Sequence, residues 1–336
     1  MTDKKIGRVA CAFAGVLWLC AGHAASAQDT ITFATDWKAE AEHGGFYQAL
    51  AKGFYKREGL DVRIRQGGPQ LDNQQLIAAG ALDFAMASNS FYAINLLQAG
   101  ADATVVMASF QKDPQILMTH PRDDINSIAD MKGKPILIGS SAVNTFWAWL
   151  KARFGFEDSQ IRKYTFNLAP WLVDKTAIQE GYLSSEPFLA LEQGIKPKVF
   201  LLADEGYPGY AAMIMVQNHI IRDHPEMVQA FIDATIDGWY SYLYDDPSPG
   251  NALIKQDNPE MTDALLAYAI DKLKSNGIVD SGDSKTLGIG AMTPARWNAF
   301  YGTMRDIGVY PAGLDVSKAY TTRFVNKGRG VRQESQ

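Results

Sequence analysis

The chain has 336 residues, 47% of them hydrophobic and 21% charged, with a formal net charge of −5. The length suits two folded units, and the composition is that of an ordinary folded protein. The acidic balance argues against a nucleic-acid partner, because phosphate binding requires a basic surface.

The first 27 residues are predicted to form a cleavable export signal. Three basic residues precede an apolar stretch at 9–22, and small residues at 25–27 provide a cleavage site before Gln28. The apolar stretch is shorter than the ~20 residues that span a bilayer, which argues against a membrane anchor. Both cysteines lie in this segment. The mature protein is therefore expected to lack disulfides, thiolate metal sites and cysteine nucleophiles.

The region from Gln28 to residue 110 alternates between two hydrophobic periods. Strands are indicated where apolar and polar residues alternate or where a short run is wholly apolar, and helices where apolar residues recur every three or four positions. The predicted strands are 30–35, 60–65, 82–87 and 103–110, and the predicted helices are 46–54, 71–79 and 90–99. This order predicts a mostly parallel sheet covered by helices on both faces.

The rest of the chain predicts a second α/β unit followed by a helical region. The predicted strands are 116–118, 135–138, 164–168, 182–184, 199–202 and 211–216, and the predicted helices are 143–154, 225–239, 262–273 and 294–307. The polar segment 326–336 is predicted to be disordered. Two such units permit a two-lobed α/β protein whose ligand lies between the carboxyl ends of the strands.

The sequence lacks the familiar catalytic signatures. It contains no phosphate-binding G-x-x-x-x-G-K motif, no G-x-S-x-G nucleophile elbow and no H-E-x-x-H zinc motif. This favours binding over catalysis, and no cofactor or metal is expected.

Several stretches at predicted strand ends carry groups that suit a small ligand. Helix starts rich in hydroxyls and N–H groups suit an anion or a carbonyl, a carboxylate suits ligand N–H groups, and aromatic rings stack on a planar ring. Helix capping, turns and core packing are the alternatives at each stretch. The candidate ligand-binding residues are Asp36, Trp37, His43, Gly44, Tyr47, Gly67, Ser88, Asn89, Ser140, Ser141, Asn144, Trp171, Glu186 and Tyr207.

Five motifs resemble those of the periplasmic substrate-binding proteins of ABC importers. The motifs are D-W and E-H-G-G-F-Y-Q-A-L-A-K-G-F-Y-K-R-E-G-L-D-V within 36–62, Q-L-I-A-A-G-A-L-D-F-A-M-A-S at 75–88, I-A-D-M-K-G-K-P-I-L-I-G at 128–139, G-Y-L-S-S-E-P-F at 181–188 and H-P-E-M-V-Q-A-F at 224–231. The sequence is most similar to the branch that includes sulfonate, nitrate and taurine binders, and pyrimidine binders related to fungal hydroxymethylpyrimidine synthases. The match covers nearly the whole chain after residue 27.

The resemblance implies the two-lobed periplasmic binding protein fold, in which two chain crossings act as a hinge. The crossings are expected near 109–113 and 211–217. Lobe one would then comprise 28–112 and 217–325, and lobe two 113–216.

The resemblance also implies roles for particular residues. In the pyrimidine-binding branch an aromatic ring stacks on the ligand, and a carboxylate accepts hydrogen bonds from the ring or amino N–H groups of the ligand. The positions of this sequence that match that pattern are Trp37, His43, Tyr47 and Glu186. Sulfonate or nitrate binding would instead use hydroxyls such as those of Ser140 and Ser141, together with Ser88.

The expected function is capture of a pyrimidine-like thiamine precursor in the periplasm and its delivery to an ABC permease and ATPase by a monomeric binding protein. A binder of a sulfonate, nitrate or aromatic carboxylate is the alternative, and a receptor that docks onto a sensor is another. A synthase-like enzyme is the most remote alternative, because the fungal synthases carry a cysteine-rich motif and this chain has no cysteine after residue 20.

Overall fold

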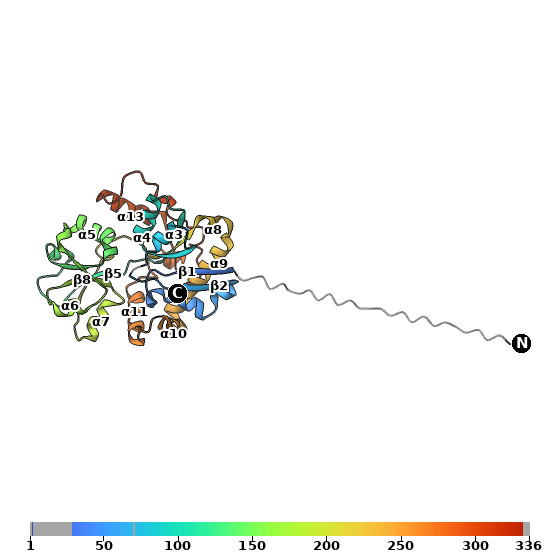
Figure 1. Cartoon of the computed structure of the whole chain (residues 1–336), viewed down its shortest axis with the longest axis horizontal. Coiled ribbons are helices and arrows are strands. Elements are labelled where there is room, and N and C mark those ends of the chain that lie inside the picture. The colour runs from blue at the N-terminus through green and yellow to red at the C-terminus, as the bar shows by residue number, and fades with distance from the viewer. Residues whose placement is uncertain (1, 3–28, 70, 332–336) are drawn as a thin grey trace.

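The computed structural model describes residues 2, 29–69 and 71–331 (Figure 1). The predicted export signal therefore lies outside the described residues, apart from Thr2. Within the described part of the chain, no helix is both long enough and apolar enough to cross a membrane.

The first five-stranded sheet has the order β2-β1-β3-β10-β4. Its strands are β1 (Asp29–Ala34), β2 (Leu60–Arg65), β3 (Phe84–Asn89), β4 (Ala103–Phe110) and β10 (Ala211–Gln217). β1 runs parallel to β2 and β3, whereas β10 runs antiparallel to both β3 and β4. We call this sheet and the helices around it lobe one.

The second five-stranded sheet has the order β7-β6-β8-β5-β9. Its strands are β5 (Gln115–Thr119), β6 (Ile136–Ile138), β7 (Ile161–Lys163), β8 (Ile178–Tyr182) and β9 (Lys198–Leu201). β6 is parallel to β7 and β8, and β5 is antiparallel to β8 and β9. This sheet and its helices form lobe two, on the left in Figure 1.

Both sheets are mixed rather than mostly parallel as expected. The reason is the same in each lobe: the first strand after a crossing between the sheets, β5 or β10, enters its sheet against the direction of its neighbours. The second crossing also comes earlier than expected, at 202–210. The strand at 211–217 was placed at the edge of lobe two, but its hydrogen bonds to β3 and β4 put it inside the sheet of lobe one.

Helices surround both sheets. In lobe one they are α1 (Gly44–Ala51), α2 (Phe54–Arg57), α3 (Asn73–Ala78), α4 (Ser90–Gln98), α8 (Asn218–Asp223), α9 (Pro225–Tyr244), α10 (Ser248–Asp257), α11 (Asp263–Ser275), α12 (Ser284–Leu287) and α13 (Pro294–Asp306). In lobe two they are α5 (Phe146–Phe154), α6 (Ala169–Val173) and α7 (Glu186–Glu192). Short 3-10 turns at Ala41–His43 and Ser140–Asn144 precede α1 and α5.

Two predicted strands of lobe two are misplaced. The segment 164–168 is a loop after β7, and Phe166 within it has a φ of 57°, in the left-handed region that interrupts an extended run. The strand predicted at 182–184 is β8, which begins at Ile178 and ends at Tyr182. The helix α10 was not predicted at all.

The core of lobe one explains where the first helix begins. The predicted apolar stripe of α9 is buried, and α9 packs on α1. A Cβ at Gly238 would lie 2.2 Å from the carbonyl oxygen of Gly45, so this close helix approach requires glycine. This contact fixes the position of α1, and therefore also the position of His43, which immediately precedes α1.

The segment predicted to be disordered from residue 326 is partly held by the fold. The Asn326 side-chain amide donates to the Met292 carbonyl at 2.7 Å, and Arg329 forms an ion pair with Asp237 at 2.7 Å. The predicted disorder therefore does not begin at residue 326, and residues 332–336 lie outside the described residues.

Candidate functional site

A cleft of about 620 Å³ lies between the two lobes. Lobe one contributes the loop after β1, the end of β3, and the segment that joins α10 to α11. Lobe two contributes the turn after β6, the loop after β7, the end of β8 and the start of α7. The cleft thus lies at the carboxyl ends of parallel strands, where ligands of open α/β sheets bind.

Eight of the fourteen candidate residues line this cleft, and they come from both lobes. They are Asp36, Trp37, His43, Ser88, Asn89, Ser140, Ser141 and Glu186. Strand-end position was thus a good guide, because it places residues far apart in sequence on one surface.

The other six candidates lie outside the cleft wall. Tyr47 is buried and its hydroxyl donates to Asp257 at 2.8 Å. Trp171 is buried in lobe two and stacks on His120 with ring centroids 3.8 Å apart. Tyr207 is buried beside Trp149. These three aromatic rings therefore belong to the packing of the lobes.

The remaining three misplaced candidates have local backbone roles. A Cβ at Gly44 would lie 1.9 Å from the Tyr242 ring, and a Cβ at Gly67 would lie 2.4 Å from the Thr35 carbonyl oxygen. Both glycines are thus needed for close packing. Asn144 is exposed at the end of the turn that precedes α5.

On the lobe-one wall, Asp36 is paired with His43. The His43 Nε2 lies 3.1 Å from Asp36 Oδ1, and the His43 side chain is only 1% exposed. Burial alone would raise the pKa of Asp36, but the hydrogen bond and charge of His43 outweigh it, and Ser88 adds a further hydrogen bond. The pKa of Asp36 is therefore lowered, and the carboxylate is ionised at neutral pH.

Two further carboxyl groups of this wall were not among the candidates. Burial raises the pKa of Glu40 well above its ordinary value, and the charges of Glu42, Asp36 and Glu186 raise it further. Burial also raises the pKa of Glu42, although a hydrogen bond from the Ser184 hydroxyl of lobe two opposes this. The run E-A-E-H at 40–43 was visible in the sequence, and a count of carboxylates around His43 was the signal that could have found both.

Glu186 begins α7 on the lobe-two wall and is held in one orientation. The Tyr164 hydroxyl donates to its Oε1 at 3.0 Å, and the Tyr182 N–H donates to its Oε2 at 2.7 Å. Burial raises the pKa of Glu186, and these two hydrogen bonds offset only part of the rise. The carboxyl group is thus preorganised at the cleft surface.

Aromatic rings meet across the cleft. Trp37 of lobe one contacts Phe166 of lobe two with ring centroids 4.6 Å apart, and Phe166 also lies against Tyr164 at 5.1 Å. Tyr92, Phe110, Phe146 and Tyr182 also line the cleft. Flat faces of this kind suit a planar ligand.

The charge of the lining is strongly acidic. Asp36, Glu40, Glu42, Glu180, Glu186 and Glu260 all line the cleft. Among the described lining residues the basic side chains are His43, which faces Asp36, and Lys38, which pairs with Glu260 at 2.9 Å, and there is no arginine. The lining is therefore rich in carboxyl groups and poor in basic side chains.

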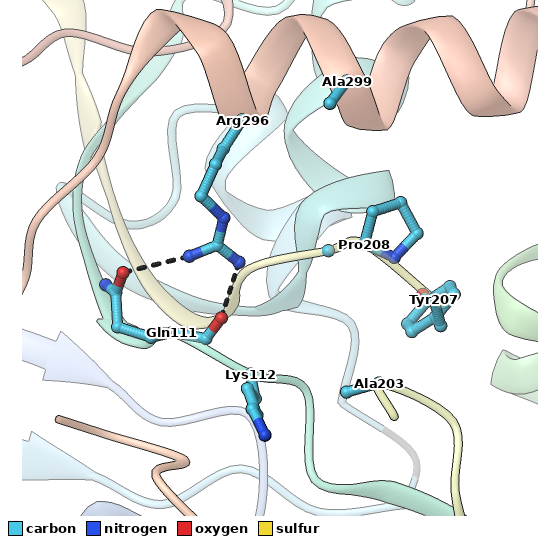
Figure 2. Close-up of a pocket in the computed structure, with 8 residues that line it drawn as sticks. Gln111, Lys112, Ala203, Tyr207, Pro208, Arg296 and Ala299 are labelled. Carbon is cyan, nitrogen blue, oxygen red and sulfur yellow. Dashed lines mark hydrogen bonds between the residues drawn. The ribbon is translucent and has the colours of Figure 1, made fainter. Parts of the chain in front are cut away.

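A second, smaller pocket of about 220 Å³ lies at the hinge (Figure 2). Arg296 of α13 donates to the side-chain oxygen of Gln111 at 3.0 Å and to its carbonyl oxygen at 2.6 Å. Its guanidinium also lies 4.0 Å from the centre of the Tyr210 ring. Gln111 is in the first crossing and Tyr210 in the second, so one side chain connects both hinge strands.

Comparison with known proteins identifies the class of protein that has this fold. The model of the family described as NMT1/THI5 like matches residues 40–249, and the chain belongs to that family. The sulfonate-binding protein SsuA of Escherichia coli has the same fold, with a TM-score of 0.65 at 13% identity, over 87% of this chain and 91% of that one. The expected fold class and family resemblance are thus confirmed.

Two relatives of established name are similar over most of the chain. The riboflavin-binding protein RibY of Chloroflexus aurantiacus is 26% identical over 318 residues, which cover 92% of this chain and 90% of that protein. The formylaminopyrimidine-binding protein of Halalkalibacterium halodurans is 26% identical over 277 residues, covering 77% and 83%.

Proposed function

We propose that this protein is the solute-binding component of an ABC importer and that it captures a planar nitrogen heterocycle of the pyrimidine type. The observation that carries the proposal is the cleft wall, where buried carboxyl groups lie beside aromatic rings. Carboxylates accept hydrogen bonds from ring and amino N–H groups, and aromatic faces stack on the ring. The names of the two relatives, which bind riboflavin and a formylaminopyrimidine, support the same ligand class.

A sulfonate or nitrate is the second candidate. Ser88, Ser140 and Ser141 all line the cleft and supply the hydroxyls that such an anion needs. An anion would, however, enter next to Asp36, which is ionised, and Glu186, whose charge is also felt by Glu40. Because like charges at short range repel, we rank the heterocycle above the anion.

The proposal places the protein in the periplasm as a monomer that meets an ABC permease and ATPase. It rests on the export signal predicted at 1–27 and on the family. The lobes proposed as moving units are those built on the two sheets, with the crossings at 111–114 and 202–210 as the hinge. N-terminal sequencing of the exported protein should give Gln28, and an unprocessed Met1 would contradict the signal.

Catalysis is not part of the proposal. The fungal synthases that the sequence resembles carry a cysteine-rich motif, and the cysteines of this chain are Cys11 and Cys20. Incubation with a bound pyrimidine followed by mass spectrometry should return the ligand unchanged. A modified pyrimidine would favour an enzyme instead.

Calorimetric titration tests the ligand class directly. The panel is formylaminopyrimidine, riboflavin and an alkanesulfonate. Trp37→Ala should remove a stacking face and Glu186→Gln should remove an N–H acceptor, each weakening heterocycle binding by about 1–3 kcal/mol. Glu226→Gln, at an exposed carboxylate in the first turn of α9 and outside the cleft and the crossings, is the control and should leave the affinity unchanged.

The same titration separates the two candidates. Under the proposal, Ser140→Ala and Ser141→Ala leave heterocycle binding nearly intact. Binding of the sulfonate alone, lost in these two serine variants and unaffected by Glu186→Gln, would overturn the proposal in favour of an anion.

A further inference from the structure

Glu180, in the middle of β8, is a carboxyl group with one unsatisfied oxygen. Its side chain lines the cleft, and the residue is only 5% exposed. The Gly139 N–H donates to Oε1 at 2.8 Å, but Oε2 is buried and has no hydrogen-bond partner among the described residues. A buried oxygen without a partner is unfavourable, so it calls for either a proton or a bound group.

The surroundings of Glu180 hold it in place. A Cβ at Gly139 would lie 2.6 Å from Glu180 Oε1 and 3.3 Å from the Phe166 ring, so the carboxyl group fills the space that glycine leaves. The next residue along the strand is Gly181, where a Cβ would lie 2.7 Å from Glu186 Oε2. The two glycines thus leave room for two carboxyl groups that both line the lobe-two wall and interact electrostatically.

The groups around Glu180 favour its neutral form. Burial raises its pKa, the Gly139 N–H opposes this, and the charge of Glu186 on α7 raises it again, to about 8. Tyr164, from the loop after β7, is the other titratable group that interacts with it. From β5 it meets the uncharged Leu117, its backbone partner. None of these neighbours is a cation.

We propose that Glu180 acts as a neutral carboxylic acid whose Oε2–H donates a hydrogen bond to an acceptor atom of the ligand. This deepens the proposed function and rests on it. Glu186, whose oxygens accept from Tyr164 and Tyr182, accepts from a ligand N–H beside it. Lobe two therefore presents a donor next to an acceptor.

The donor–acceptor pair narrows the ligand class. The edge of a ligand that complements this pair carries a hydrogen-bond acceptor beside an N–H group. A ring nitrogen next to an amino group has this pattern, and so does a lactam. A ligand whose edge carries N–H groups only, such as an organic cation, would instead need an ionised Glu180.

The first test needs no ligand. Unfolding by urea compares wild type with Glu180→Gln, which mimics the neutral acid, and with Glu226→Gln as the exposed control outside the cleft and the crossings. Because the folded-state pKa is raised above about 4.3, wild type should lose stability relative to Glu180→Gln as the pH rises from about 4.3 to about 8. A difference that is flat across this interval would show an ordinary pKa and overturn the proposal.

The second test uses formylaminopyrimidine and riboflavin as probes in calorimetric titrations. Glu180→Gln keeps a donor, so its affinity should stay within about twofold of wild type near neutral pH, whereas Glu180→Ala should lose about tenfold. Wild-type affinity should fall above about pH 8, and that of Glu180→Gln should not.

The two tests separate failure of this inference from failure of the proposed function. Equal losses in Glu180→Gln and Glu180→Ala would show that the charge is needed and would overturn the inference while heterocycle binding stands. If neither probe binds, the proposed function fails, and the urea experiment still decides the protonation of Glu180.

Discussion

Both walls of the cleft carry carboxyl groups, four on lobe one and two on lobe two, but the Asp36 carboxylate is stabilised differently from the two on lobe two. On the lobe-one wall, Asp36 is balanced by His43 at 3.1 Å and its pKa is lowered. On the lobe-two wall, Glu180 and Glu186 receive hydrogen bonds from neutral groups, and both pKa values are raised.

This difference assigns different tasks to the walls. The Asp36–His43 hydrogen bond forms within lobe one, so it shapes the site whether or not a ligand is present. The lobe-two carboxyl groups remain incompletely balanced, so their protonation responds to what enters the cleft. Specificity is therefore expected to depend more on lobe two, and the rigidity of the site more on lobe one.

The largest effect that would test this contrast is on folding. Gly44→Ala forces a Cβ to within 1.9 Å of the buried Tyr242 ring, and we expect a loss of about 3 kcal/mol in the free energy of unfolding. Gly139→Ala meets a side-chain oxygen of Glu180 rather than a buried ring, and we expect a smaller loss of less than about 1 kcal/mol. Denaturant unfolding measures both.

Gly302→Ala is the matched control. Gly302 lies within α13 with open space around it, so alanine there should stabilise the protein by about 0.5–1 kcal/mol. Similar losses at Gly44 and Gly139 would contradict the idea that the lobe-one wall is the rigid one.

The next largest effect is on how the free energy of unfolding depends on pH. Asp36→Asn should lower the free energy of unfolding by about 1.5–3 kcal/mol at neutral pH, because a charge-assisted hydrogen bond to His43 is lost. The pKa of Asp36 is lowered in the folded state, so this stabilisation is present above about pH 3.9 and disappears as the pH falls through the folded-state value.

The pH dependence at Asp36 should thus be opposite in sign to that at Glu180. Asp61→Asn, which affects an exposed pair with Arg63, is the control and should change stability by less than about 0.5 kcal/mol. Parallel urea titrations over pH would show the opposite slopes, and slopes of the same sign would refute the contrast between the walls.

The smallest effect is at the hinge, which both walls share. Arg296→Lys cannot reproduce the two hydrogen bonds to Gln111, and we expect ligand affinity to fall about fivefold with no change in its pH dependence. Arg305→Lys, on the same helix and paired with Asp306 at the surface, should have no effect. Calorimetry measures the affinity, and an altered pH profile in Arg296→Lys would show that it acts on the cleft instead.

The first four strands and the long helices α9, α11 and α13 of lobe one could be predicted because their periodicity is undisturbed, whereas α10 was missed and the helix predicted at 46–54 is two helices, α1 and α2. The buried stripe of α9 and the apolar strand β4 follow from the sequence alone. The strands of lobe two were harder to predict, because they are short and the geometry of the loops decides where they end. Phe166, with its left-handed backbone, lies inside a stretch of alternating apolar and polar residues that resembles a strand.

The candidate site was predictable where position on a strand end decides exposure, as for Asp36, Ser88 and Glu186. The candidate site was not predictable where side-chain packing decides whether a residue faces the cleft or the core. Tyr47 and Trp171 follow strand ends too, but each turns into its lobe, which depends on neighbours distant in sequence such as Asp257 and His120. Glu180 lies within a strand, where no motif marks it.

The hydrogen bond from Ser184 to Glu42 joins the two lobes without any ligand atom. It forms only when the lobes meet, so it favours the closed arrangement independently of the contacts that a ligand makes. A ligand then shifts the existing equilibrium between open and closed lobes rather than creating a new state. Its measured affinity is reduced only by the part of the free energy of closure that the Ser184–Glu42 hydrogen bond does not supply. The transporter would accordingly encounter closed molecules that carry no cargo, and a Ser184→Ala variant would present fewer of them.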